Sequence, residues 1–145
     1  LPQIAKTEAG KPYLCTDPSC FISLSHTAGA VSAALSAGSI GVDVEGQRSY
    51  PGELPARFAA PEEIAQFGVL GAWTLKESAV KVKGRLDRDW RDIAYSGTRK
   101  KILCPEGIAC ARLVEAEGFT LAIAAADMQD LPEPEWIPEK DLLLF

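Results

Sequence analysis

The chain has little of what several common classes of protein require. Its 145 residues include one histidine, and the four cysteines lack the CxxC spacing of a zinc site. No apolar run approaches the ~18 residues of a membrane helix. The opening LPQIAKTEAGK also lacks the apolar segment of a signal peptide. We therefore expect reduced thiols, no zinc centre, no membrane span and a cytoplasmic location.

Several ligand and catalytic motifs are absent as well. Neither of the phosphate-binding motifs GxGxxG and GxxxxGK[ST] occurs, and there is no GxSxG nucleophile motif. The net charge of −5 disfavours nucleic-acid binding. Residues 76–101 nevertheless hold nine basic and four acidic side chains. Two interpretations of this basic stretch stay open: a face toward an anionic ligand or acidic partner, or an ordinary solvated surface.

What is present is typical of one globular domain. The hydrophobic share of 47% and the charged share of 24% are ordinary values, so residues 1–145 are expected to form a single domain. The acidic segment 127–145 contains three prolines and is expected to lie over the surface of that domain.

The order of the expected elements predicts the fold class. Strands are expected first, then helices, then strands again, which indicates an α+β fold with helices packed on one face of a mostly antiparallel sheet. Residues 30–36 and 40–45 are expected to form a hairpin, and Glu117-Gly118 a turn. Residues 1–20 are expected to be irregular, and the early strands to span 21–25, 30–36 and 40–45. Helices are expected at 53–59, 61–67 and 70–83, with a break near Gly68 and Gly71 and an end at Gly84. The late strands are expected in RDIAYS, KKILC, IACARLVEAE and FTLAIAAAD.

Two acids share one face of the strand at 40–46. Asp43 and Glu45 are two residues apart, and the apolar side chains Ile40, Val42 and Val44 occupy the opposite face. One interpretation is a pair of solvated acids on an exposed strand face. The other is a metal site, since two carboxylates together suit Mg²⁺.

A second set of polar residues lies on the helix expected at 70–83. Glu77 and Lys81 are four residues apart, the spacing of an ordinary surface ion pair. Trp73 lies one turn earlier on the same face, which indicates that this face is partly buried, where charges without a function are costly. Lys76, about a hundred degrees round the helix from Glu77, is expected to matter less to any chemistry there.

Four segments together resemble a known enzyme family. IGVDVE at 40–45 and WTLKESAVK at 73–81 resemble the two-part signature of the 4′-phosphopantetheinyl transferases. GKPYL at 10–14 and FISLSHT at 21–27 resemble two motifs that precede this signature in the surfactin-synthetase-activator (Sfp-type) branch. The motifs occur in the same order as in that branch and cover about residues 10–84, so the chain resembles the second half of the family's usual pseudo-dimer.

The resemblance implies an activity and a metal site. The family transfers the phosphopantetheine arm of coenzyme A to a serine of an acyl or peptidyl carrier protein, in fatty acid biosynthesis and in secondary metabolism, and releases adenosine 3′,5′-bisphosphate. Asp43, Glu45 and Glu77 would hold Mg²⁺ on the coenzyme A pyrophosphate. Glu77 would be catalytic if it also accepts the serine proton, either directly or through a water on the metal, and both routes stay open.

The resemblance also implies residues that contact the substrate. Lys81 would be catalytic and would meet the charge that develops on the leaving phosphate. Lys11, Ser25 and His26 would contact the nucleotide end of coenzyme A.

Two departures from the family pattern bear on the function. Asp43 and Glu77 are 34 residues apart, which is shorter than usual in this branch, and the chain supplies little more than one half of the pseudo-dimer. Either the chain is a fragment, or it forms a homo-oligomer as the small trimeric holo-acyl-carrier-protein synthases do. The alternative to an enzyme is a non-catalytic half-domain that binds coenzyme A or a carrier protein.

Overall fold

The computed structural model describes residues 2–142, so the last three residues of the expected tail lie outside the described part. The fold is α+β, as predicted, and every strand pairing within the described residues is antiparallel. The strands are β1 (Ile4–Lys6), β2 (Pro12–Leu14), β3 (Phe21–Thr27), β4 (Ala30–Ser36), β5 (Ile40–Gly46), β6 (Ser96–Thr98), β7 (Lys101–Leu103), β8 (Cys110–Ala116) and β9 (Phe119–Ala125). The helices are α1 (Leu54–Phe58), α2 (Pro61–Lys83), the 3₁₀ turn η1 (Trp90–Asp92) and α3 (Glu139–Leu142).

The strands divide among three sheets, with the orders β1-β2-β3-β4, β5-β9-β8 and β6-β7. The predicted hairpin of residues 30–36 and 40–45 is wrong, because β4 pairs with β3 and β5 pairs with β9. The reason lies in β9, which is buried on both faces along most of its length. Such a strand needs hydrogen-bonded neighbours on both edges, and β5 and β8 supply them.

Two further expectations for local structure are wrong and two are confirmed. Residues 1–20, expected to be irregular, contain the short strands β1 and β2, and the expected strand RDIAYS is largely η1 and loop. The predicted turn at Glu117-Gly118 joins β8 and β9, with φ values of 54° and 79°. Gly84 ends α2 with φ 85°, as predicted.

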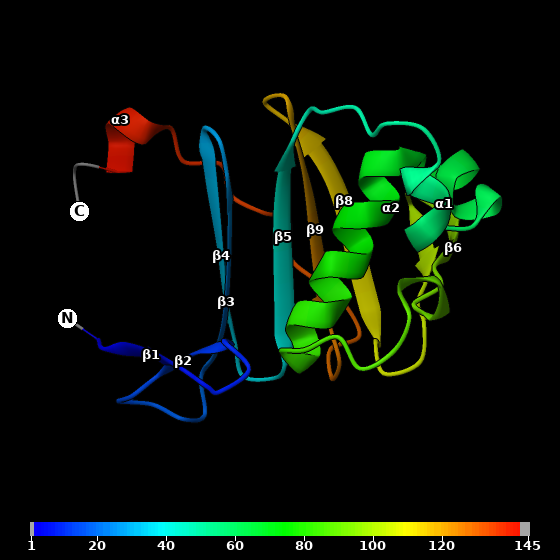
Figure 1. The fold of residues 1–145 in the computed structure, drawn as a ribbon. Coiled ribbons are helices and arrows are strands. Elements are labelled where there is room, and N and C mark those ends of the chain that lie inside the picture. The colour runs from blue at the N-terminus through cyan, green and yellow to red at the C-terminus, as the bar shows by residue number, and fades with distance from the viewer. Residues whose placement is uncertain (1, 143–145) are drawn as a thin grey trace.

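Three layers position the candidate site. Figure 1 shows the β3–β4 hairpin on one side of β5 and α2 on the other. The apolar face of β5 packs with β9 against small residues of β4, and the main members of this cluster are Ile40, Val42, Val44, Leu121 and Ile123. The opposite face of the sheet packs against α2, mainly through Leu75, Ala79, Val82, Leu113, Ala122 and Ala124. None of the helices in residues 2–142 is both long and apolar enough to cross a membrane.

Helix α2 contains the break that its glycines predict. The expected helices 61–67 and 70–83 form one element, but Gly68 inside it has the non-helical angles φ 75° and ψ 165°. The Arg99 guanidinium donates a hydrogen bond of 2.7 Å to the Phe67 carbonyl beside the break. The second part of α2 therefore takes its own direction along β5.

Gly41 allows α2 to lie directly against β5. A Cβ atom at this position would lie 2.1 Å from the Ser78 carbonyl oxygen and 2.7 Å from the Val82 nitrogen, both of them backbone atoms. We expect Gly41→Ala to lower the free energy of unfolding by about 1–3 kcal/mol, because the helix has to move away from the strand. Urea unfolding measures this. Gly46→Ala is the control on the same strand, since its Cβ would meet no atom closer than 3.7 Å; equal losses in the two variants would contradict the prediction.

All four cysteines lie in the described residues and all are free thiols, as predicted. Burial, with a smaller contribution from Cys110, raises the pKa of the Cys104 thiol to about 11. At pH 8 about one Cys104 side chain in a thousand is then a thiolate, the reactive form. We expect iodoacetamide at pH 8 to alkylate the exposed Cys15 well before Cys104, and the Cys104 rate to rise about tenfold per pH unit up to its pKa. Peptide mass spectrometry of timed samples measures both rates, and comparable labelling of the two at pH 8 would show the expectation to be wrong.

Candidate functional site

The candidate site lies between β5 and α2. The strand alternates as predicted: Asp43 and Glu45 point away from the apolar cluster, on the same face as Gly41, which contacts α2. Asp43 is buried with 4% of its surface exposed, whereas Glu45 is half-buried. The interpretation of this pair as solvated acids on an open strand face is therefore wrong for Asp43.

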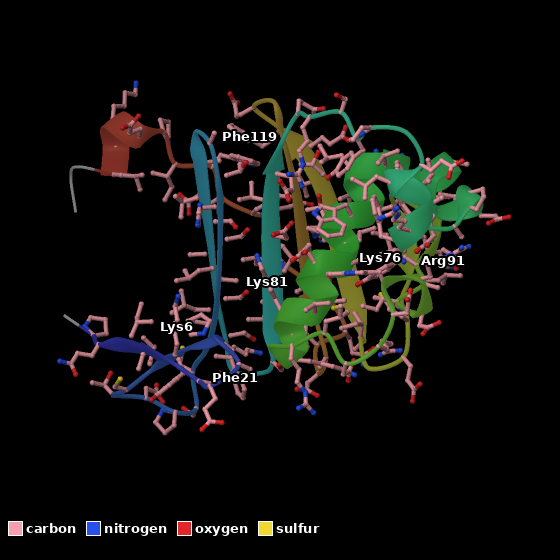
Figure 2. All side chains as sticks on the ribbon, viewed as in Figure 1. Lys6, Phe21, Lys76, Lys81, Arg91 and Phe119 are labelled. Carbon is pink, nitrogen blue, oxygen red and sulfur yellow. The ribbon has the colours of Figure 1, made fainter. Side chains whose placement is uncertain are left out.

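Residues of α2 meet these acids in reverse order along the strand. The Trp73 indole donates to a Glu45 carboxylate oxygen at 3.1 Å, and the Lys81 ammonium donates to Asp43 Oδ1 at 2.8 Å. Glu77 lies midway between Trp73 and Lys81 on the same helix face, which places it opposite the stretch of β5 between the two acids. Figure 2 shows Lys81 on the β5 side of α2.

The electrostatics of Glu77 support this placement. Burial raises the pKa of the Glu77 carboxyl, and the charge of Asp43 raises it further, followed by a smaller contribution from Glu45. Lys81 acts in the opposite direction. The three carboxylates are thus close enough to repel one another, which a cation between them would relieve.

Strand β3 covers the free edge of β5 with side-chain hydroxyls instead of backbone groups. Three hydroxyls of β3 accept hydrogen bonds from backbone amides of β5, and we call this set the hydroxyl ladder. Its pairs are Val42 N to Ser23 at 3.0 Å, Val44 N to Ser25 at 3.2 Å and Gly46 N to Thr27 at 3.4 Å. The Ser25 hydroxyl also donates to Asp43 Oδ1 at 2.8 Å, so it fixes both the strand and the acid.

The two oxygens of Asp43 have different surroundings. Oδ1 accepts from Ser25 and from Lys81, whereas Oδ2 is buried and has no hydrogen-bond partner. A buried carboxylate oxygen without a partner is costly and is a ready ligand for a hard cation. The donor set fits Mg²⁺ in its chemistry. Within residues 2–142, however, no group of three or more His, Cys, Asp or Glu side chains already stands in metal-binding geometry, so binding by all three acids would require their carboxylates to move closer together.

The structure brings some of the predicted site residues together and separates others. Lys81 forms its ion pair with Asp43, not with Glu77 at the surface spacing that the sequence suggests. Lys11 lies at the end of α2, where its ammonium donates to the Ser39 hydroxyl at 3.2 Å and to the Val82 carbonyl. Burial lowers the pKa of Lys11. His26 is exposed and follows Ser25 directly in β3, so it points to the other face of the hairpin.

One residue near the site was missed at the level of sequence, and the burial of another residue of α2 was not foreseen. Arg48 donates to Glu45 at 3.0 Å, and its position three residues after Glu45 was the available signal. Lys76 is fully buried and forms a 3.0 Å ion pair with Glu63 on the side of α2 away from β5. No local pattern distinguishes this lysine from the half-buried Lys81 and the exposed Lys83 that follow it.

We expect Ser25→Ala to lower the free energy of unfolding by about 1–3 kcal/mol, since it removes the partner of the buried Val44 amide and one of the two partners of Asp43 Oδ1. Thermal or urea unfolding measures the loss. Ser49→Ala, at an exposed position in the following loop, is the matched control and should change stability by no more than about 0.5 kcal/mol. Equal stability of the two variants would contradict the role given to Ser25.

No protein-family model matches the chain, and no curated protein sequence matches it.

Proposed function

We propose that the chain is a cytoplasmic, Mg²⁺-dependent 4′-phosphopantetheinyl transferase that modifies a serine of an acyl or peptidyl carrier protein. The observation that carries the proposal is Asp43, a buried carboxylate with one oxygen unpartnered, held by Ser25 and Lys81 opposite Glu77. Its support is the agreement of this geometry with the four-motif resemblance. A stability role alone accounts poorly for three acids gathered on one partly buried face.

The residues have distinct roles in the proposed reaction. Asp43, Glu45 and Glu77 hold Mg²⁺, which supplies neutralising charge to the pyrophosphate of coenzyme A. The serine oxygen forms a new bond to the phosphorus that carries the pantetheine arm, and the bond from that phosphorus to the oxygen of the adenosine 3′,5′-bisphosphate breaks. Glu77 would accept the serine proton, either directly or through a water. Lys81 stabilises the charge on the departing phosphate.

The contacts of three residues in the structure decide which of them is proposed to bind coenzyme A. His26, whose side chain is exposed, is the proposed contact for the nucleotide end. In this proposal Ser25 and Lys11 act mainly on the protein itself, because Ser25 fixes Asp43 and Lys11 ties the β1–β2 segment to the end of α2.

The test is the mass of an apo carrier protein after incubation with the chain, coenzyme A and Mg²⁺. The proposal expects a gain equal to one phosphopantetheine group, blocked by EDTA and by Asp43→Asn. No gain with several acyl and peptidyl carrier proteins, from a preparation shown to be folded, would reject the enzyme.

One observation favours a homo-oligomer, both for the enzyme and for the alternative function, a binding half-domain without turnover. The outer face of the β3–β4 hairpin exposes Leu24, Val31 and Leu35, with 43%, 79% and 68% of their surfaces accessible. An exposed apolar patch of this kind is typical of a surface that binds another protein. We propose that a second copy of the chain binds this patch in a homo-oligomer, and light scattering after size exclusion measures the mass of the assembly.

The carrier-protein test separates the enzyme from the half-domain. Binding of coenzyme A or of a carrier protein, without a gain in the mass of the carrier protein, would select the half-domain.

A further inference from the structure

The Lys81 ammonium lies on Oδ1 of Asp43, the carboxylate whose other oxygen, Oδ2, is the one open to a metal ion. It lies 2.8 Å from Asp43 Oδ1, and the Ser25 hydroxyl donates to the same oxygen. The two partners differ in freedom. Ser25 is buried in the hydroxyl ladder, whereas the Lys81 side chain is 29% exposed, against 6% for the Asp43 side chain. Lys81 can therefore leave Asp43 toward solvent, and Ser25 cannot.

The charges around the site are balanced without a metal ion except at one carboxylate. Arg48 pairs with Glu45, and Lys81 pairs with Asp43. Glu77 forms no ion pair within 4.0 Å in the part of the chain that the structure describes. A divalent ion on Asp43 Oδ2 would meet the Lys81 ammonium at close range on the same carboxylate, and such repulsion is strong where water is scarce.

We propose that Lys81 is the built-in counter-ion of Asp43 and competes with the divalent cation, so that metal binding frees the ammonium for the phosphate. The inference rests on the proposed function, since it assigns a regulation to that metal site. It gives Asp43 a positively charged partner while no metal ion is bound. It also couples metal binding to phosphate binding, because the Lys81 ammonium becomes available for the phosphate only after the metal ion has bound.

Lys81 is a better candidate for this competition than Arg48. The Arg48 side chain is 49% exposed and donates to Glu45 and to the Tyr50 hydroxyl, so water screens its charge. Its carboxylate partner also keeps the Trp73 indole as a second donor. Removal of Arg48 should therefore reduce the repulsion of a divalent ion at Asp43 less than removal of Lys81 does.

The experiment measures binding of Mn²⁺, a paramagnetic substitute for Mg²⁺, to the full chain without coenzyme A. Electron paramagnetic resonance of free Mn²⁺ gives the Kd. We expect Lys81→Met to lower the Kd on the order of tenfold, the effect of removing one nearby positive charge. Lys81→Arg keeps the charge and should stay within about threefold of the wild type. Lys83→Met is the matched control on the same helix, since Lys83 pairs with the exposed Asp87, and should change the Kd by less than about twofold.

A second measurement follows the ammonium itself. Lysines are reductively methylated with ¹³C, and the Lys81 signal is assigned by its absence from Lys81→Met. We expect this signal to shift when Mg²⁺ is added and the Lys83 signal to stay in place. Circular dichroism confirms that each variant is folded.

The outcomes separate the competition from the enzyme. If the wild type binds Mn²⁺ and modifies a carrier protein while Lys81→Met has an unchanged or higher Kd, the competition is rejected and the enzyme stands. If no variant binds Mn²⁺ and the carrier protein gains no mass, the metal site and the proposed function are both rejected.

Discussion

Replacement of Lys76 by methionine is expected to lower the free energy of unfolding by about 3–5 kcal/mol, the cost of leaving one buried charge of a pair alone. Lys76 is fully buried and Glu63 is 4% exposed. The ammonium lies 3.0 Å from the Glu63 carboxylate and 3.0 Å from the Trp90 carbonyl, and it also donates to Ile93. Since many domains have a stability of only about 5–15 kcal/mol, this change would remove a large part of the free energy of unfolding.

Glu63 makes the loss larger than that of a single ion pair. One of its oxygens accepts from the Ala60 amide at the start of α2, and the other accepts from the Tyr95 amide at 2.9 Å. The pair thus connects the helix start with the segment after η1. Urea unfolding of Lys76→Met and of Lys83→Met measures the difference, and the exposed control should lose no more than about 0.5 kcal/mol. The double variant Glu63→Met/Lys76→Met should recover part of the loss, because no charge then remains unpaired. Similar stability of the two single variants would disprove this role.

Replacement of Lys81 by alanine is expected to reduce kcat by on the order of a hundredfold or more, if the proposed function holds. The reason is that a preorganised ammonium stabilises the leaving phosphate mainly in the transition state. The affinity for coenzyme A should therefore change much less than kcat. Steady-state kinetics with an apo carrier protein as acceptor give both quantities.

The control for this kinetic comparison has to be chosen from the structure. Lys76, which the sequence suggests as a nearby lysine of less importance, is unsuitable because its replacement is expected to destabilise the chain strongly. Lys83 is exposed and two residues from Lys81, so Lys83→Ala is the appropriate comparison. Equal and small effects of Lys81→Ala and Lys83→Ala on kcat would refute the role assigned to Lys81.

The sequence predicts the parts of this fold that local periodicity determines. Alternation along residues 40–45 separates the acid face from the apolar face of β5, and the glycines at positions 68 and 84 give the break and the end of α2. The partly buried face of α2 also follows from the spacing of Trp73 and Glu77. These features depend on neighbours within one or two turns, which the sequence displays directly.

The remaining features depend on contacts between distant segments. The error over the hairpin arose because short loops favour neighbouring strands, while the need of β9 for two partners took β5 away from β4. The partner of Lys81 could not be predicted either, since two acids, Glu77 and Asp43, were within reach of one flexible side chain. Burial of Lys76 likewise depends on carbonyls after η1, which no local pattern relates to α2.

The pairing of β5 with β9 has a consequence for protein synthesis. Among residues 2–142, the one strand hydrogen-bonded to β5 spans residues 119–125, far along the chain from Asp43 and Glu45. As a nascent chain leaves the ribosome, all the candidate metal and catalytic residues emerge well before the strand that holds β5 in its sheet. Until β8 and β9 have been synthesised, the strand that carries the two acids has no hydrogen-bonded strand partner. Pairing of strands so far apart in the sequence is slow compared with helix formation. A chain that stops before Phe119 would keep every candidate site residue and still be unable to assemble the site.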